Sequence, residues 1–165
     1  MGLSRMILKR LPLPFGLVAA FVSPGVAFDT REAETVVVIL EELALERGQA
    51  IHAGAAAEWY AYDAEGTGLI AAAGFTEARW TSAYHAVVAG LVAATPQAEF
   101  DAMFAEPLAR LAASSLAEEQ KSAIRVKYAA QVVEARSIRA AGAAHAAAVA
   151  PLLTRLQALT YGPAD

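Results

Sequence analysis

The feature of this sequence that most constrains its fold is a long apolar repeat in the last third of the chain. Eleven residues follow one another at alternating spacings of four and three. This heptad spacing places all of them on one face of a single helix, and it predicts a long helix that packs within a bundle. They are Ile124, Tyr128, Gln131, Ala135, Ile138, Gly142, His145, Val149, Leu152, Leu156 and Leu159.

Capping signals predict the limits of this helix. Ser115, with Glu118 three residues later, fits a capping box, in which the two side chains satisfy backbone N–H groups at the helix start. Pro151 falls inside the repeat and should kink the helix, because a proline there costs about 3 kcal/mol. The helix should end at Tyr161, since Gly162 and Pro163 follow.

Composition indicates that the rest of the chain is helical as well. About a quarter of the residues are alanine, which has the highest helix propensity, and no strand or hairpin signal is present. We therefore predict an all-α fold, an irregular helical bundle of about four to five helices, two of them long. The expected segments are a helix from Asp29 or Thr30 to about Tyr62, a loop at 63–68, a turn at 69–73 ended by Gly74, helices at 77–94 and 96–105, and a kink or new short helix from Pro107 to Ala113.

The N-terminal segment 1–27 has the three parts of a cleavable signal peptide. Three basic residues precede an apolar run at 11–22, and the small residues that follow it end at Ala27. We expect cleavage between Ala27 and Phe28, which would leave one helical domain at 28–165 in the periplasm or secreted. The apolar run is shorter than the roughly 20 residues that a spanning helix needs, so we expect no stable membrane anchor after cleavage.

Charge and cysteine content exclude several classes of function. Without residues 1–27 the chain carries 10 basic and 17 acidic residues, which argues against nucleic-acid binding because that function needs a basic face. The chain has no cysteine, which rules out disulfides, thiolate zinc sites and covalently attached haem. The core must therefore be held by packing alone.

The charges are divided unevenly along the chain. Residues 28–106 contain 13 acidic and three basic residues, whereas residues 107–165 contain four acidic and seven basic ones. We favour an arrangement in which the two halves lie near each other and compensate. The alternative is a basic interaction face for an acidic partner or for membrane headgroups. Its residues would be Lys121, Arg125, Lys127, Arg136 and Arg139.

Histidines are the candidates for a cofactor site. His145 falls on the apolar repeat and His52 flanks another apolar face, so the two could ligate a haem or a metal between facing helices, with Met103 as an alternative ligand. No carboxylate lies three or four residues from any histidine, so we favour structural roles and expect no cofactor and no metal. No serine elbow or glycine-rich phosphate loop is present, and we expect no catalytic residue and no enzyme.

Three aromatic residues, Trp59, Tyr60 and Tyr62, precede the glycine-containing loop. Aromatic side chains are enriched at interfaces, so they could line the rim of a binding surface. They could equally close one end of the bundle, and this is the interpretation that we favour.

The segment from Leu116 to Lys121, Leu-Ala-Glu-Glu-Gln-Lys, resembles the Leu-Thr-x-x-Gln-Arg/Lys motif of the small periplasmic chaperones related to Spy and CpxP. Ala117 stands where that family has threonine, and the second copy of the motif that the family usually has is absent. The resemblance implies an exported, all-helical protein that forms cradle-shaped dimers and holds unfolded client proteins.

These observations predict an exported, non-enzymatic helical protein of the cell envelope. Its long apolar repeat and its alanine-rich faces favour binding to a protein partner or to a second copy of itself. The alternatives are a haem- or metal-binding bundle that uses His145 with His52 or a methionine, and a chaperone-like holdase.

Overall fold

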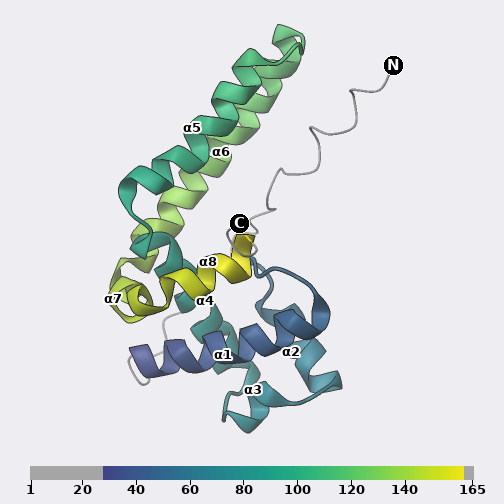
Figure 1. Cartoon of the computed structure of the whole chain (residues 1–165), viewed down its shortest axis with the longest axis vertical. Helices are drawn as coiled ribbons and strands as arrows, with labels where there is room; N and C mark the ends of the chain where they lie inside the picture. The colour runs from purple at the N-terminus through teal and green to yellow at the C-terminus, as the bar shows by residue number, and fades with distance from the viewer. Residues whose placement is uncertain (1–27, 162–165) are drawn as a thin grey trace.

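The computed structural model describes residues 28–161, and this part of the chain is all-α, with no strand. The predicted fold class is therefore confirmed. Figure 1 shows a compact body from which two helices project as a hairpin. The elements are α1 Thr30–Arg47, α2 Ala56–Glu65, α3 Leu69–Ala72, α4 Glu77–Ala94, α5 Gln97–Ala113, α6 Glu118–Gly142, α7 Ala146–Val149 and α8 Leu153–Tyr161, with 3₁₀ turns η1 Ala143–His145 and η2 Ala150–Leu152.

The expected signal segment, residues 1–27, lies outside the described residues. Phe28, on the C-terminal side of the expected cleavage point, is the first residue that the structure describes. None of the helices within 28–161 is long and apolar enough to cross a membrane.

The first helix is shorter than the sequence predicts. The Asp29 side chain caps α1 by accepting a hydrogen bond from the Glu32 N–H at 2.8 Å, as expected. The helix then ends at Gly48, which has a positive φ of 63° and donates its N–H to the Ala44 carbonyl. Glycine adopts this left-handed conformation without steric cost, so Gly48 stops the helix rather than bending it. The prediction of a helix as far as Tyr62 was therefore wrong.

Helix α4 forms the centre of the body. Thr76 caps it as predicted, and its side chains Trp80, Tyr84 and Val87 are fully buried. They pack in a core with side chains from α1, α2, α3, α7 and α8. Two of the three fully buried aromatic rings of this core have a partner for their polar atom, whereas the Trp59 Nε1 atom has none among residues 28–161. Trp80 Nε1 donates to the Ala56 carbonyl at 2.9 Å, and the Tyr84 hydroxyl donates to the His52 carbonyl at 2.7 Å.

Helix α5 runs without a break through Pro107, where the sequence predicts a kink or a new helix. A proline leaves the carbonyl four residues earlier, here that of Met103, without its helical donor. The Tyr128 hydroxyl on α6 donates to this carbonyl at 3.2 Å and replaces the missing bond. The neighbouring helix thus offsets part of the cost of a proline in the helix interior.

The long C-terminal helix extends from Glu118 to Tyr161 but changes direction at two 3₁₀ turns. Pro151 lies in the second of these, η2, where the tighter turn accommodates it. The first, η1, follows Gly142, which crosses α4 at very short range. A Cβ atom added at Gly142 would lie 2.0 Å from the Ala89 carbonyl oxygen, so only glycine permits this crossing.

Candidate interaction surface

We call α5, α6 and the tip at 114–117 the arm, and the remaining described residues the body. Only Phe100, Lys121 and Ala135 are buried between residues 97 and 141 of the arm. The arm also carries five of the eight exposed large hydrophobic side chains among residues 28–161. An apolar surface that residues 28–161 leave exposed is typical of a binding region. These five are Met103, Leu108, Leu116, Val126 and Val133.

The inner face of α6 is the one that the apolar repeat predicts. All eleven positions of the repeat are buried or half-buried, so its orientation is confirmed. On the arm this face meets α5 through a chain of aromatic rings. Phe104 lies edge-on to Phe100 at 5.2 Å and to Tyr128 at 6.1 Å between ring centroids.

A second row of small and apolar residues lies on the exposed side of α6, and we call it the outer stripe. Its members repeat at spacings of three and four, and every one is solvent-exposed. Val126 and Val133 are 70% and 67% exposed. The stripe was not predicted, because half of its members are alanine and one is serine, although its heptad spacing was visible in the sequence. It consists of Ala123, Val126, Ala130, Val133, Ser137 and Ala140.

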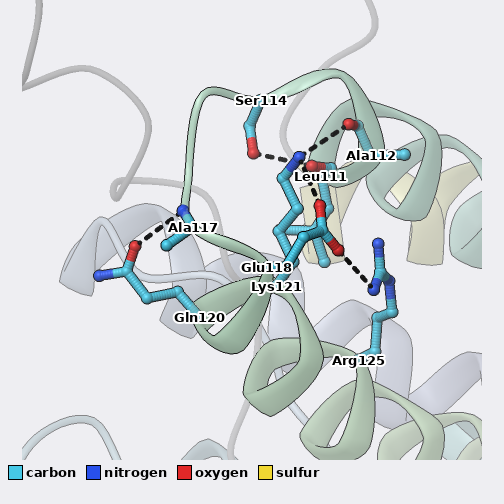
Figure 2. Close-up of polar contacts among 8 residues, drawn as sticks. All are labelled: Leu111, Ala112, Ser114, Ala117, Glu118, Gln120, Lys121 and Arg125. Atoms are coloured by element: carbon cyan, nitrogen blue, oxygen red, sulfur yellow. Dashed lines mark hydrogen bonds and ion pairs between the residues drawn. The ribbon is translucent and has the colours of Figure 1, made fainter.

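The tip of the arm shows how α6 begins (Figure 2). The predicted cap at Ser115 was wrong, because α6 starts at Glu118 with Ala117 as its N-cap. Alanine has no side-chain acceptor, so only half of a capping box forms, in which the Gln120 side chain accepts from the Ala117 N–H at 3.2 Å. Ser114 caps the preceding helix instead, and its hydroxyl donates to the Leu111 carbonyl at 2.7 Å.

Two of the predicted interaction residues point inward and close helix ends. Lys121 is only 8% exposed, and its ammonium group donates to the Ala112 carbonyl at 3.2 Å at the end of α5 (Figure 2). Arg139 donates to the carbonyls of Val92 and Thr95 at 2.6 and 2.8 Å at the end of α4. Cations at helix C-termini satisfy unpaired carbonyls and oppose the helix dipole. As a correction, Lys121 is therefore not available to a partner.

The other basic residues of α6 remain exposed. Arg125 forms an ion pair with Glu118 at 3.5 Å, and the side chains of Lys127 and Arg136 are solvent-exposed. Glu118 also accepts from Lys121, and this hydrogen bond lowers the pKa of the Glu118 carboxyl below its usual value.

The two halves of the chain do compensate each other at one place. Arg155 on α8 makes two hydrogen bonds to the Glu41 carboxylate on α1, at 2.8 and 2.6 Å. These bonds hold the pKa of Glu41 below its usual value and raise that of Arg155. The pair fastens the last helix onto the first.

The aromatic cluster belongs to the core. Trp59 is fully buried and is therefore not at the surface, contrary to its inclusion among possible interaction residues. Tyr60 and Tyr62 are half-buried and pack against the same core. The Arg47 guanidinium lies 5.3 Å from the Trp59 ring and 5.4 Å from the Tyr62 ring, and it covers the outer edge of the cluster.

The candidate cofactor histidines lie in different surroundings. His145 is half-buried, and its ring packs edge-on against Phe28 at 5.2 Å. His52 lines a small cavity of about 60 Å³ that also contains Met103, but not His145. The buried Nδ1 atom of His52 has no hydrogen-bond partner among the described residues.

This cavity is much smaller than the roughly 300 Å³ of a typical cofactor site, so a haem there would need the arm to move. No group of three or more histidine, aspartate or glutamate side chains in the described range is arranged to hold a metal. Cofactor binding therefore stays a prediction.

Asp63 is a buried carboxylate near the end of α2, although its position in the sequence predicts a loop. Its two oxygens accept from the N–H groups of Leu69 and Ile70, each at 2.8 Å. The side chain thus closes the α2–α3 connection and caps α3. Both oxygens are committed to backbone groups, which indicates a structural role.

Comparison with known proteins adds no relative to this description, since no family model, curated protein or solved structure matches the chain.

Proposed function

We propose that this is a non-enzymatic, exported helical protein that associates with a second copy of itself through the outer stripe of α6. The observation that carries the proposal is the stripe itself, an exposed heptad row on a helix whose opposite face already packs within the chain. Heptad rows of this kind pack against a matching helix, and small residues allow the two backbones to approach closely.

The distribution of charge favours a second copy as the partner. The arm carries six acidic and six basic residues, whereas the body within 28–161 carries ten acidic and four basic ones. Two bodies would repel each other, but two arms meet without net repulsion. Within the arm, α6 has three acidic and five basic residues and α5 has three acidic and one basic. Each α6 would therefore also attract the α5 of the other copy.

An antiparallel arrangement about a two-fold axis fits these charges. Lys127 and Glu134 lie seven residues apart beside the stripe, and their midpoint is one residue from the middle of the stripe. A two-fold axis there places Lys127 of each copy opposite Glu134 of the other, so the same ion pair forms twice. Such pairs at the edge of a helical interface select the partner and its orientation.

Light scattering coupled to size-exclusion chromatography tests the proposal. We expect a dimer that Val126→Lys or Val133→Lys weakens by about tenfold or more, because a charge would be buried in an apolar contact. Val38→Lys is the matched control, since Val38 is also exposed but lies on the body. A wild-type protein that stays monomeric, or equal effects of all three substitutions, would contradict self-association.

Charge reversal tests the orientation. Lys127→Glu and Glu134→Lys should each weaken the dimer, and the double variant should restore it. If the double variant is no better than either single one, the antiparallel arrangement is wrong although a dimer exists.

The exposed apolar arm also supports a second candidate function, a holdase that binds unfolded proteins. In that case the wild-type protein would slow the aggregation of a denatured client, and Val126→Lys would lose this effect. Failure of the wild-type protein to slow aggregation would remove the holdase from consideration.

A further inference from the structure

An open groove of about 530 Å³ lies at the root of the arm, where the end of α4 and the start of α5 face the end of α6. Its volume is within the range of small-molecule sites. Four alanines and Phe100 form its apolar lining, and Arg136, Arg139 and Gln97 supply the polar groups. The short alanine side chains leave the space that larger residues would fill.

The groove concentrates positive charge in an otherwise acidic molecule. Its lining has two arginines and no carboxylate, although residues 28–161 contain 16 acidic and only ten basic side chains. Arg136 and Arg139 are three residues apart on α6, and like charges at this spacing destabilise a helix. Neither guanidinium forms an ion pair with a carboxylate within the described range.

The two arginines are held differently. Arg139 is fixed by its hydrogen bonds to the carbonyls of Val92 and Thr95, and it lies 4.9 Å from the centre of the Phe100 ring. Arg136 is exposed, and no hydrogen bond or ion pair to its side chain forms within 28–161. A fixed cation beside one whose hydrogen-bond donors are unused within 28–161 suits an anionic group, which accepts from the unused donors.

From this lining we infer that the groove binds a single-chain amphiphile with an anionic head, either a carboxylate or a phosphate. Arg136, supported by the positive field of Arg139, receives the head by charge-assisted hydrogen bonds. The aliphatic chain lies along Phe100 and the alanines, where its burial is favourable. The groove shares Ala140 with the outer stripe, but Val126 and Val133, which the self-association test alters, do not line it.

Isothermal titration calorimetry with four probes tests the inference: decanoate, decyl phosphate, decanol and inorganic phosphate, the alkyl compounds below their critical micelle concentrations. We expect binding of decanoate or decyl phosphate, and the tighter of the two identifies the preferred head. Decanol and inorganic phosphate should bind at least about tenfold more weakly, because decanol lacks the anionic head and inorganic phosphate lacks the alkyl chain. Equal binding of decanol, or of inorganic phosphate, would overturn the proposal.

Substitutions locate the binding. Arg136→Gln should weaken it about tenfold by removing the head contact, and Ala143→Leu should weaken it by filling the groove. Ala143 is exposed, so circular dichroism should show an unchanged fold. Arg110→Gln is the control, since it removes the same charge from α5 outside the groove. Unchanged affinity in both Arg136→Gln and Ala143→Leu would overturn the site.

The same titration with Val126→Lys separates this site from self-association. We expect the alkyl anion to bind this variant as it binds the wild-type protein, whatever the oligomeric state. Loss of binding in Val126→Lys alone would show that the site belongs to the dimer interface and would overturn the inference.

Discussion

The body and the arm differ in how their helices are stabilised. In the body, side chains from six helices bury one another around Trp80 and Tyr84, and three fully buried aromatic rings contribute large apolar areas. In the arm, two helices of 17 and 25 residues share one contact face. Only a thin row of half-buried side chains joins them, and polar contacts close the ends.

The free energy of folding is divided unequally between the two regions. Most apolar burial, and therefore most of the hydrophobic stabilisation, belongs to the body. The arm depends on fewer contacts, among them the Tyr128 bond at Pro107 and the lysine cap at its tip. A region with so little burial opens at a lower free energy than the core. An arm that pairs with a second arm would regain burial in the complex.

The largest expected difference between the regions follows from shortening one leucine in each. Leu40→Ala in the body should lower the free energy of unfolding by about 2–5 kcal/mol, because Leu40 is fully buried. Leu111→Ala in the arm should cost about 1 kcal/mol, because Leu111 is only half-buried. Urea denaturation monitored by circular dichroism measures both, and equal losses would contradict the proposed difference.

The next largest effect should arise where the two regions meet. Gly142→Ala places a Cβ atom 2.0 Å from the Ala89 carbonyl oxygen and should cost about 1–3 kcal/mol by forcing α4 and α6 apart. Gly54→Ala is the control, because the nearest atom to its added Cβ is 4.0 Å away. A Gly142→Ala protein as stable as the control would mean that the crossing is looser than described.

A smaller and opposite effect is expected at the tip. Ala117→Ser should raise the stability by about 1 kcal/mol, because serine supplies the missing N-cap acceptor for α6. Ser115→Ala should change little, since Ser115 lies outside the helix. Thermal unfolding of the two variants compares these positions directly. Loss of stability in Ser115→Ala would place the helix start where the sequence predicts it.

The smallest effects concern pH. Burial lowers the pKa of His85 below 6.5, and the hydrogen bond from Arg155 lowers that of Glu41 below 4.5. In both cases the unfolded chain binds the proton more readily. The stability that each group contributes is therefore complete above the unfolded value and is lost as the pH falls through the folded value.

Unfolding measured between pH 7 and pH 3 checks these shifts. His85→Gln should flatten the profile below about pH 6.5, and Glu41→Gln should flatten it below about pH 4.5. Glu118→Gln in the arm should change it less, because that exposed carboxylate is screened by solvent. A larger effect of Glu118 than of Glu41 would reverse the expected order.

Local signals predicted much of the fold. The sequence predicts the helix caps at Asp29 and Thr76 and the apolar repeat on α6, because each depends on residues close together in the sequence. The errors came from longer-range effects. Pro107 lies within a continuous helix, and the Met103 carbonyl that it leaves without a helical donor accepts a hydrogen bond from Tyr128, 21 residues after the proline. No pattern of neighbouring residues predicts a hydrogen-bond donor so distant in the sequence.

The candidate site was less predictable than the fold. Basic residues on α6 suggested a binding face, but Lys121 and Arg139 are used to cap the ends of other helices. The Lys121 cap depends on the packing of α6 against α5 and the Arg139 cap on its packing against α4, and both are contacts between different helices rather than within one. Arg136 lines the same groove as Arg139, but its side chain caps no helix within 28–161.

The tip of the arm lies far from every core contact, and this has a consequence for the length of the molecule (Figure 1). Adding seven residues to α5 and seven to α6 would extend the arm by about 10 Å without disturbing the body. In a pair joined arm to arm, the arm would act as a spacer that sets the separation of the two bodies. Related chains could then span different gaps with the same body.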